Sequence, residues 1–241
     1  HVRPQFSDQY AIGLTKTFAN LSQGSIDVFY RDLHRVIEFK DFAQLLLNDQ
    51  LETELLEGVG RTYGIEFDYK KQKGRHIIEA NYTFSRSERQ VVASATQEGV
   101  NGGDWYPSIY DQPHAFNLNY AFKPNFRNTF SVNFTYSTGR PITVPIGSFR
   151  NSNVLSIPVF SDRNAFRIPD YHRLDLAYTL DVFPKKGKRW KGSWTFSIYN
   201  FYGRRNAYSV FFRQVAFQRI RAFRISVLGS VFPSVSYNFK F

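Results

Sequence analysis

The chain has 241 residues, of which 18% are aromatic and 21% charged, and its formal net charge is +11. Its mean hydropathy is -0.39, and no apolar run approaches the ~18 residues that a transmembrane helix needs, which excludes a helical membrane protein. It contains no cysteine, which excludes disulfides, thiolate catalysis and cysteine-based metal sites.

Alternating apolar and polar residues predict about nine β-strands along the chain. In order, they cover residues 8–18, 25–31, 64–70, 78–85, 116–122, 130–137, 173–182, 194–198 and 231–241. Short connections, such as 20–24 and 72–74, alternate with long ones, such as 41–60 and 92–108. Short turns in the periplasm and long loops outside are typical of bacterial outer-membrane barrels, so the pattern favours that architecture.

The long connection 41–60 carries leucines and phenylalanine among acidic residues. Asp41 has the chemistry of a helix N-cap and Gly58 that of a C-terminal stop. We expect a loop with a short helix here.

The last eleven residues alternate apolar and mostly polar side chains up to the terminal atom, and only Phe232 breaks the pattern. The apolar members share one face of the predicted strand: Val231, Pro233, Val235, Tyr237, Phe239 and Phe241. The stripe is long enough to cross a bilayer, which takes ~9–11 tilted strand residues. Since this strand leaves a long connection, we expect the C-terminus on the periplasmic side.

These patterns predict an all-β fold, an antiparallel transmembrane β-barrel. An odd number of strands cannot be a complete barrel of the usual even-stranded kind, and an open sheet would leave unpaired edges in lipid. The chain also opens at His1 with no signal peptide. We therefore expect residues 1–241 to be a partial barrel domain whose remaining strands lie upstream. The alternative is a soluble β-sandwich rich in tyrosine and phenylalanine.

Six stretches, in the right order and covering nearly the whole chain, resemble the C-terminal barrel of TonB-dependent receptors. They lie at residues 61–66, 82–86, 136–141, 169–176, 198–204 and 233–241, and include Thr138-Gly139-Arg140-Pro141 and Pro169-Asp170-Tyr171-His172-Arg173. The similarity is to the branch with a carboxypeptidase-regulatory-like domain before the plug.

The resemblance implies a plugged barrel of about 22 strands, of which this chain would be the last nine. It implies active uptake of a scarce ligand, such as a siderophore, glycan or peptide, driven by the TonB complex through the missing N-terminus. Two other functions stay open: a structural barrel subunit of a larger outer-membrane assembly, and a soluble glycan-binding β-domain.

No residue pattern predicts an enzyme, a metal site or a cofactor. The five histidines lack metal-ligand spacing, and we expect hydrogen-bonded or interfacial roles for them. In the loop around Gly102, Trp105 and Tyr106 could stack on a ligand, but the favoured interpretation is loop packing or the outer aromatic girdle. The other ligand candidates are arginines of external connections: Arg140, Arg150, Arg163 and Arg167.

The basic charge predicts anionic membrane partners rather than nucleic acid, because it lies in connections and not on one helix or sheet face. Lipopolysaccharide phosphates are the expected partners of four external residues: Arg204, Arg205, Arg219 and Arg221. The turn 184–192 would meet anionic phospholipid or simply be solvated.

The C-terminal aromatics Tyr237, Phe239 and Phe241 resemble the signal by which barrel-assembly machinery recognises its clients. Further expected partners are outer-membrane lipid, the missing plug and barrel strands, and a surface lipoprotein.

Overall fold

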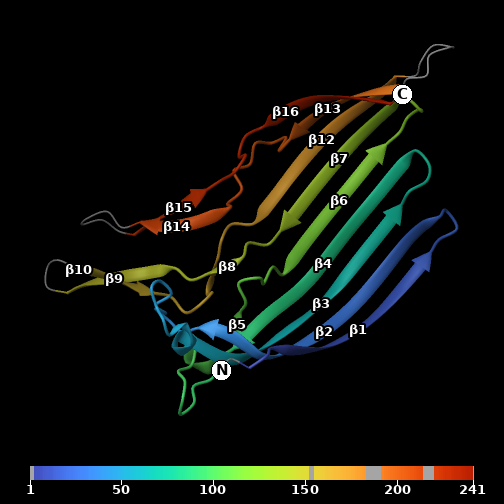
Figure 1. Ribbon diagram of the computed structural model, residues 1–241. Coiled ribbons are helices and arrows are strands. Elements are labelled where there is room, and N and C mark those ends of the chain that lie inside the picture. The colour runs from blue at the N-terminus through green and yellow to red at the C-terminus, as the bar shows by residue number, and fades with distance from the viewer. Residues whose placement is uncertain (1–2, 152–154, 183–190, 214–219, 241) are drawn as a thin grey trace.

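The computed structural model describes residues 3–151, 155–182, 191–213 and 220–240. Within these residues the principal sheet is antiparallel and follows the path β1-β2-β3-β4-β6-β7-β12-β13-β16 (Figure 1), with the short β5 added to β4. The strands on this path are β1 (Phe6–Thr17), β2 (Ser22–Phe39), β3 (Leu55–Lys71), β4 (His76–Gln90), β6 (His114–Phe122), β7 (Asn128–Ser137), β12 (Tyr171–Val182), β13 (Lys191–Tyr199) and β16 (Phe232–Lys240). Over the described residues, the prediction of nine strands with alternating short and long connections is therefore confirmed.

The smaller elements all lie in the long connections. They are η1 (Leu51–Glu54), η2 (Asn101–Gly103), β5 (Tyr106–Pro107), β8 (Pro141–Ile142), β9 (Pro145–Asn151), β10 (Leu155–Phe160), β11 (Phe166–Arg167), β14 (Ser209–Arg213) and β15 (Arg221–Ile225). β9 pairs with β10, β8 with β11 and β14 with β15, so two of these connections contain hairpins of their own. No helix in the described part of the chain is long and apolar enough to cross a membrane.

The strand register joins the apolar stripes of successive strands into one continuous face. Val28 pairs with both Ile12 and Ile65, and further along the sheet Phe134 pairs with both Leu118 and Leu174. We call this the outer face and the opposite, mostly polar side the inner face. Paired strand residues point to the same side of a sheet, so the register confirms the period-2 reading of the sequence.

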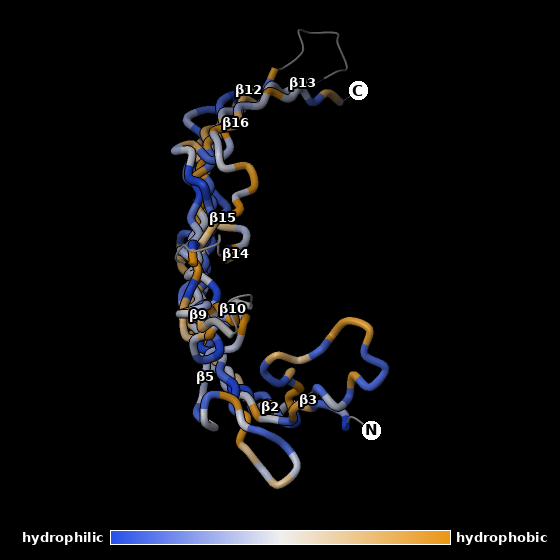
Figure 2. The backbone as a smooth tube through the Cα atoms, turned by 90° about the vertical axis from the view of Figure 1, so that its left-hand side faces the viewer, coloured by the Kyte–Doolittle hydropathy of each residue, from blue (hydrophilic) through white to orange (hydrophobic). Residues whose placement is uncertain are grey.

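Along the middle of the strands, no other part of the described chain covers the outer face. Ile12 and Leu14 are 76% and 71% exposed, although a soluble sandwich would bury such side chains under a second sheet. Seen edge-on, the sheet is strongly curved, and the connection between β2 and β3 lies on its concave side (Figure 2). A curved single sheet with an exposed apolar face has the architecture of a barrel wall rather than of a sandwich.

Aromatic and histidine side chains gather at both ends of the outer face. His76, His114 and His172 each lie at the start of a strand, and each shares a hydrogen bond of 2.7–2.8 Å between Nδ1 and a tyrosine hydroxyl. At the short-turn end, the ring centroids of Trp194 and Tyr237 are 4.6 Å apart. These are the two aromatic girdles of a membrane barrel, and the expectation of hydrogen-bonded histidines is confirmed for these three.

β2, β3 and β4 are 18, 17 and 15 residues long, which exceeds the ~9–11 residues needed to cross the bilayer. These strands are also longer than the ranges predicted from the sequence, which were 25–31, 64–70 and 78–85. Beyond the girdle polar residues occupy both faces, so the alternation of apolar and polar residues ends there. Arg61 and Glu88, for example, pair across β3 and β4 on the outer face. These three strands therefore continue past the bilayer at the end that carries the long connections.

The connection between β2 and β3 does carry a short helical turn, η1, but the predicted helix caps are wrong. Asp41 pairs with Arg163 instead of capping a helix. Gly58 lies inside β3, where an added Cβ would come within 2.5 Å of the Gln90 carbonyl oxygen of β4. Gly58 is thus explained by close strand packing and not by helix termination.

Candidate functional site

The long connections, together with the chain start, lie at one end of the sheet, and the short turns and the C-terminal strand end at the other (Figure 1). The candidate ligand site consists of polar side chains on the inner face, at the end of the sheet that carries the long connections. Their strands place them: Tyr171 and Arg173 alternate with His172 and Leu174 of the outer face, and Tyr199 follows Ile198 in β13.

Arg173 is the centre of this inner cluster. Its guanidinium donates 2.8 Å and 3.0 Å hydrogen bonds to the hydroxyls of Tyr199 and Tyr171, and Nε donates to the Asp175 carboxylate at 2.9 Å. It also stacks 4.3 Å from the centroid of the Tyr199 ring. The two phenol rings are therefore held in fixed positions along the wall.

A cavity of about 330 Å³ opens beside this cluster. Tyr171 and Tyr199 line one side, and the connections contribute Arg140, Asn206 and others. The full lining is Gln112, Ser137, Thr138, Gly139, Arg140, Ile168, Pro169, Tyr171, Tyr199, Asn206, Ala207, Tyr208, Val227 and Leu228. Arg140 is exposed, and its guanidinium has one long 3.5 Å hydrogen bond, to the Tyr208 carbonyl, among the residues that the structure describes. It can therefore turn toward a ligand at little cost.

Asp170 and Gly139 fix the rim of the cavity. The Gly139 amide and the Tyr136 hydroxyl donate to the two oxygens of the Asp170 carboxylate at 2.9 Å and 2.8 Å. The Gly139 hydrogen bond is the main reason that the pKa of Asp170 is held below its ordinary value, against an opposing effect of burial. A Cβ on Gly139 would lie 1.7 Å from the Ile168 carbonyl oxygen, so this position accepts only glycine without rearrangement.

A second inner cluster, around Arg163, ties two connections to β2 and β4. Its guanidinium donates to the Phe39 carbonyl at 2.6 Å and lies 3.5 Å from Glu38, and its second amino group pairs with Asp41. Glu38 also pairs with Arg89 of β4. Four charges thus balance one another, and Arg163 connects loops rather than presenting a free cation to the lumen.

Tyr106 lies beneath this cluster and is only 2% exposed. Burial, and next the charge of Glu38, raise the pKa of Tyr106 to about 12, although Arg163 and Arg89 act in the opposite direction. It packs with Leu56, Val91 and Val100 in the one apolar cluster of fully buried residues found within the described chain. Its role here is packing.

Trp105, next in sequence, points to the other side. Its ring lies 4.2 Å from the guanidinium carbon of Arg61, an outer-face residue of β3. The two candidate aromatics are therefore not brought together, and their geometry agrees with loop packing and the outer girdle rather than with a shared stacking site.

Arg167 is half-buried and links two connections through the buried Asp111. It pairs with the Asp111 carboxylate, and its guanidinium donates to the Asp111 and Gly139 carbonyls at 2.7 Å and 3.0 Å. Asp111 is 1% exposed and also accepts the Ser87 amide. Of the predicted ligand arginines, only Arg140 thus lines the cavity, and the side chain of Arg150 lies outside the described residues.

The arginines predicted to meet lipopolysaccharide are dispersed. Arg204 donates to the Asp170 carbonyl at 2.9 Å and to Asn206 at 3.1 Å, so it holds the strand entry of β12. Arg205 and Arg221 are exposed, and Arg221 stands opposite Arg213 in the β14–β15 hairpin. Arg219 lies outside the described residues. Contact with lipopolysaccharide stays a prediction for all four.

The C-terminal stripe lies on the outer face, where Tyr237 pairs with Trp194 and Phe239 with Gly192. Phe241 lies outside the described residues, so the insertion signal stays a prediction. Within the part of the chain that is described, no three His, Asp or Glu side chains gather as a metal-ligand set. The expectation that no metal or cofactor binds stays a prediction too.

Arg173, Tyr171 and Tyr199 were not predicted as site residues. The sequence did contain a signal for them, because each occupies a polar-face position at the loop end of a strand. Arginines and aromatic residues of the long connections were predicted instead.

Together, the curved antiparallel sheet, its apolar outer face with two aromatic girdles, and its polar inner wall define a segment of a transmembrane β-barrel. A family model described as TonB dependent receptor-like, beta-barrel, matches residues 2–201. The chain therefore belongs to this family of outer-membrane receptors, which are not enzymes.

Two solved structures share the fold. The chain is similar to the ferripyoverdine receptor of the outer membrane of Pseudomonas aeruginosa bound to ferripyoverdine, with 12% identity and a TM-score of 0.57, over 99% of this chain and 27% of the receptor. It is also similar to the closed form of the ferric-catecholate import receptor Fiu from K12 E. coli, with 13% identity and a TM-score of 0.52, over 99% of this chain and 28% of that one. The chain thus spans about a quarter of these receptors. No curated protein sequence matches it.

Proposed function

We propose that this chain forms the C-terminal wall of an outer-membrane receptor that imports a scarce ligand through its lumen. The observation that carries the proposal is the inner-face cavity at the loop end, with Tyr171 and Tyr199 fixed by Arg173 and with Arg140 at the rim. Phenol rings and an exposed guanidinium are groups that hold a compact aromatic or anionic ligand.

The orientation follows from the asymmetry of the connections. The long connections and the cavity face the outside, and the short turns and the C-terminus face the periplasm. Ligand captured at the cavity then enters the lumen, and the TonB complex supplies energy through parts of the receptor outside this chain. The barrel-assembly machinery inserts the receptor by way of the C-terminal strand.

Ferric chelates are the first ligands to test, since the two solved neighbours are a ferripyoverdine receptor and a ferric-catecholate import receptor. Identities of 12–13% support the fold only, so oligosaccharides and oligopeptides belong in the same panel.

The test uses cells that carry the full-length receptor, a deletion strain, and radiolabelled iron(III) complexed with a catecholate or a hydroxamate chelator. Import predicts uptake that requires the receptor, stops with a protonophore, and is lost without TonB. With Tyr199→Ala, half-saturation of uptake should shift by about tenfold, the effect of ~1.4 kcal/mol of lost contact. Tyr110→Ala removes an exposed loop tyrosine outside the cavity and should leave uptake unchanged.

The structural-subunit alternative predicts a different outcome. If the deletion strain takes up every chelate, oligosaccharide and oligopeptide of the panel as well as the parent does, the import function is contradicted.

A further inference from the structure

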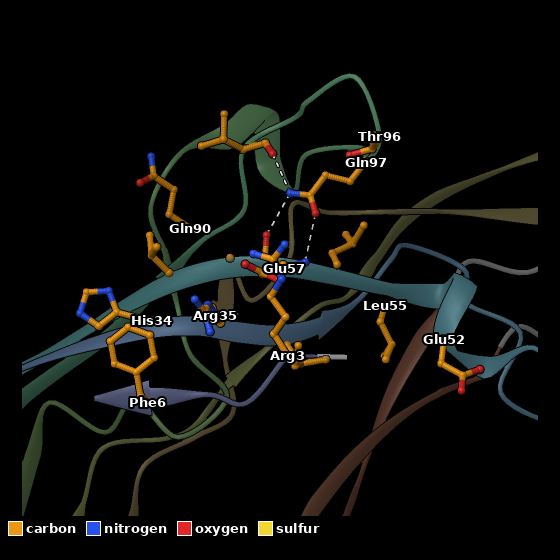
Figure 3. A pocket seen from close by; sticks show the side chains of 15 residues that line it. Arg3, Phe6, His34, Arg35, Glu52, Leu55, Glu57, Gln90, Thr96 and Gln97 are labelled. Atoms are coloured by element: carbon orange, nitrogen blue, oxygen red, sulfur yellow. Dashed lines mark hydrogen bonds between the residues drawn. The ribbon is translucent and has the colours of Figure 1, made fainter. Parts of the chain in front are cut away.

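The inner-face cavity carries an unbalanced positive charge, which distinguishes it from a larger cavity in the same wall. That larger cavity, of about 750 Å³, lies beside β1, β2, β3 and the connection after β4 (Figure 3). Its lining includes two arginines and two glutamates, Arg3, Arg35, Glu52 and Glu57, so its charges balance. In the inner-face cavity, Arg140 is the one charged residue of the lining, and it has no ion-pair partner among the described residues.

The two carboxylates close to the inner-face cavity do not cancel this charge, because both are engaged elsewhere. Asp175 pairs with Arg173 at 2.9 Å and accepts the Asn200 amide at 2.8 Å. Asp170 accepts the two hydrogen bonds described above, and Arg204 donates to its carbonyl at 2.9 Å. Neither carboxylate belongs to the lining of the cavity. The cavity is therefore suited to an anion.

Arg173 determines how two phenols of the lining can hydrogen-bond. Its Nη1 donates to the hydroxyl oxygens of both Tyr199 and Tyr171, at 2.8 Å and 3.0 Å. Because a cationic donor occupies one side of each oxygen, the hydroxyl hydrogen has to point away from it. Donation from a charged group also polarises the phenol and strengthens its own hydrogen as a donor. Among the described residues neither hydroxyl donates to another protein group, so both hydrogens remain for a ligand.

Other polar groups of the lining are largely used by the protein itself. The side-chain oxygen of Asn206 accepts from the His172 amide and from Arg204, both at 3.1 Å, and its nitrogen donates to the His172 carbonyl at 2.9 Å. The Thr138 hydroxyl accepts the His114 amide at 3.1 Å. A ligand rich in donors thus finds few acceptors here. The apolar part of the lining consists of Ile168, Pro169, Ala207, Val227 and Leu228.

We propose that Arg173 makes the inner-face cavity selective for a carboxylate attached to a compact apolar group. The carboxylate oxygens accept from Tyr171 and Tyr199, the guanidinium of Arg140 supplies the opposite charge, and the apolar lining packs against the attached group. Arg173 is a positioning residue, since it acts through the two phenols and is not itself part of the lining. The inference rests on the proposed function, because it takes this cavity as the capture site of the imported ligand.

The carboxylate can come from an aromatic acid or from the C-terminus of a short peptide, and matched probes distinguish these sources. Benzoate and its methyl ester represent the first source, and N-acetylphenylalanine and its amide the second. The Kd of each probe for the full-length receptor in detergent is measured by NMR titration. The parent should bind the acid of at least one pair about tenfold more tightly than its uncharged counterpart, as expected for hydrogen bonds to a charged group.

Substitutions then separate the donors from the residue that orients them. Tyr171→Phe and Tyr199→Phe keep the rings and remove the donors, so each should weaken binding of the acid about tenfold and leave the ester or amide unchanged. Arg173→Met combined with Asp175→Asn removes both members of an ion pair, keeps the local net charge, and should reduce the preference for the acid to below about threefold. A merely structural role of Arg173 would weaken both members of a pair equally. Tyr110→Phe alters an exposed tyrosine outside the cavity and should change nothing.

Folding of each variant is checked by the heat-dependent gel shift. If the double variant does not fold, Arg173→Lys replaces it, since lysine keeps the ion pair with Asp175 but lacks the guanidinium fork, and the preference for the acid should fall likewise. The inference is overturned if the parent binds no probe, if it shows no preference for either acid, or if the Arg173 variant keeps the preference of the parent. Import of a chelate by a receptor without this preference would overturn the inference alone, whereas selective binding without any import would support it and contradict the import function.

Discussion

Leu176 offers a direct test of which face of the sheet meets lipid. It lies in the middle of the twelve-residue strand β12 and pairs with Val132 and Ile198, all on the outer face. With these two and Pro233 of β16 it lines an apolar groove of about 440 Å³. A strand of this length just spans the hydrocarbon, so its middle residue stands near the bilayer midplane.

An arginine at the midplane of a membrane barrel costs about 2–4 kcal/mol. Leu176→Arg should therefore lower the folded-to-unfolded ratio about 30- to 700-fold, since each ~1.4 kcal/mol is tenfold. Thr179→Arg is the matched control, because Thr179 is three residues along the same strand but on the inner face, where it shares a 3.1 Å hydrogen bond with Thr195. Losing that hydrogen bond costs only about 1 kcal/mol.

The assay is denaturant unfolding of the full-length receptor in lipid vesicles, with the heat-dependent gel shift as the measure of folded barrel. Leu176→Arg should shift the unfolding midpoint strongly and Thr179→Arg weakly. Equal shifts for the two variants would mean that both faces are packed, as in a soluble sandwich, and would refute the assignment of the faces.

Three further predictions concern the loop end and the last strand. Gly139→Ala should destabilise the cavity rim by about 1–3 kcal/mol, because its Cβ would overlap a carbonyl across the loop; limited proteolysis should cut this variant faster, while Gly147→Ala, which has open space around it, should behave as the parent does. The pKa of Asp170 is lowered in the folded state, so its contribution is present at neutral pH and is lost as pH falls below its ordinary value of 3.8; the parent should be more stable than Asp170→Asn at pH 7, and a gap that persists unchanged at pH 3 would contradict this assignment. Phe239→Ser should reduce the inserted amount of receptor far more than Asn238→Ser does, and an unfolding shift of about 1.5–3 kcal/mol with normal insertion would instead indicate simple loss of apolar burial.

The strands of the barrel wall could be predicted from sequence because lipid imposes a strict pattern. Inside the bilayer every second residue must be apolar, and the register then places Val28 beside Ile65 and Phe134 beside Leu174 as the pattern requires. Beyond the bilayer that constraint ends. Asp32 and Arg61 are polar residues on the outer face, which is why the extensions of β2 and β3 were missed.

The loop end was harder to predict because its contacts join residues distant in sequence. Arg163 and Asp41 are 122 residues apart, and Arg167 and Asp111 are 56 apart. The sequence around an arginine in a connection does not indicate whether the side chain will hold loops together or bind a ligand. The β-bulge at Arg35, where the register of β2 with β3 shifts, could not be predicted for a similar reason. A bulge depends on how two strands pair and not on the local sequence.

Cysteine labelling shows whether the long connections face the outside of the cell and the short turns the periplasm. Single cysteines in the cysteine-free chain would be treated, in intact cells, with a reagent that cannot cross the outer membrane. We expect labelling in intact cells at Leu46, Trp105, Ser152 and Gln214. At Gly24, Gly74, Asn125 and Gly187 we expect labelling only after the membrane has been broken. Labelling of the second group but not of the first in intact cells would contradict this orientation.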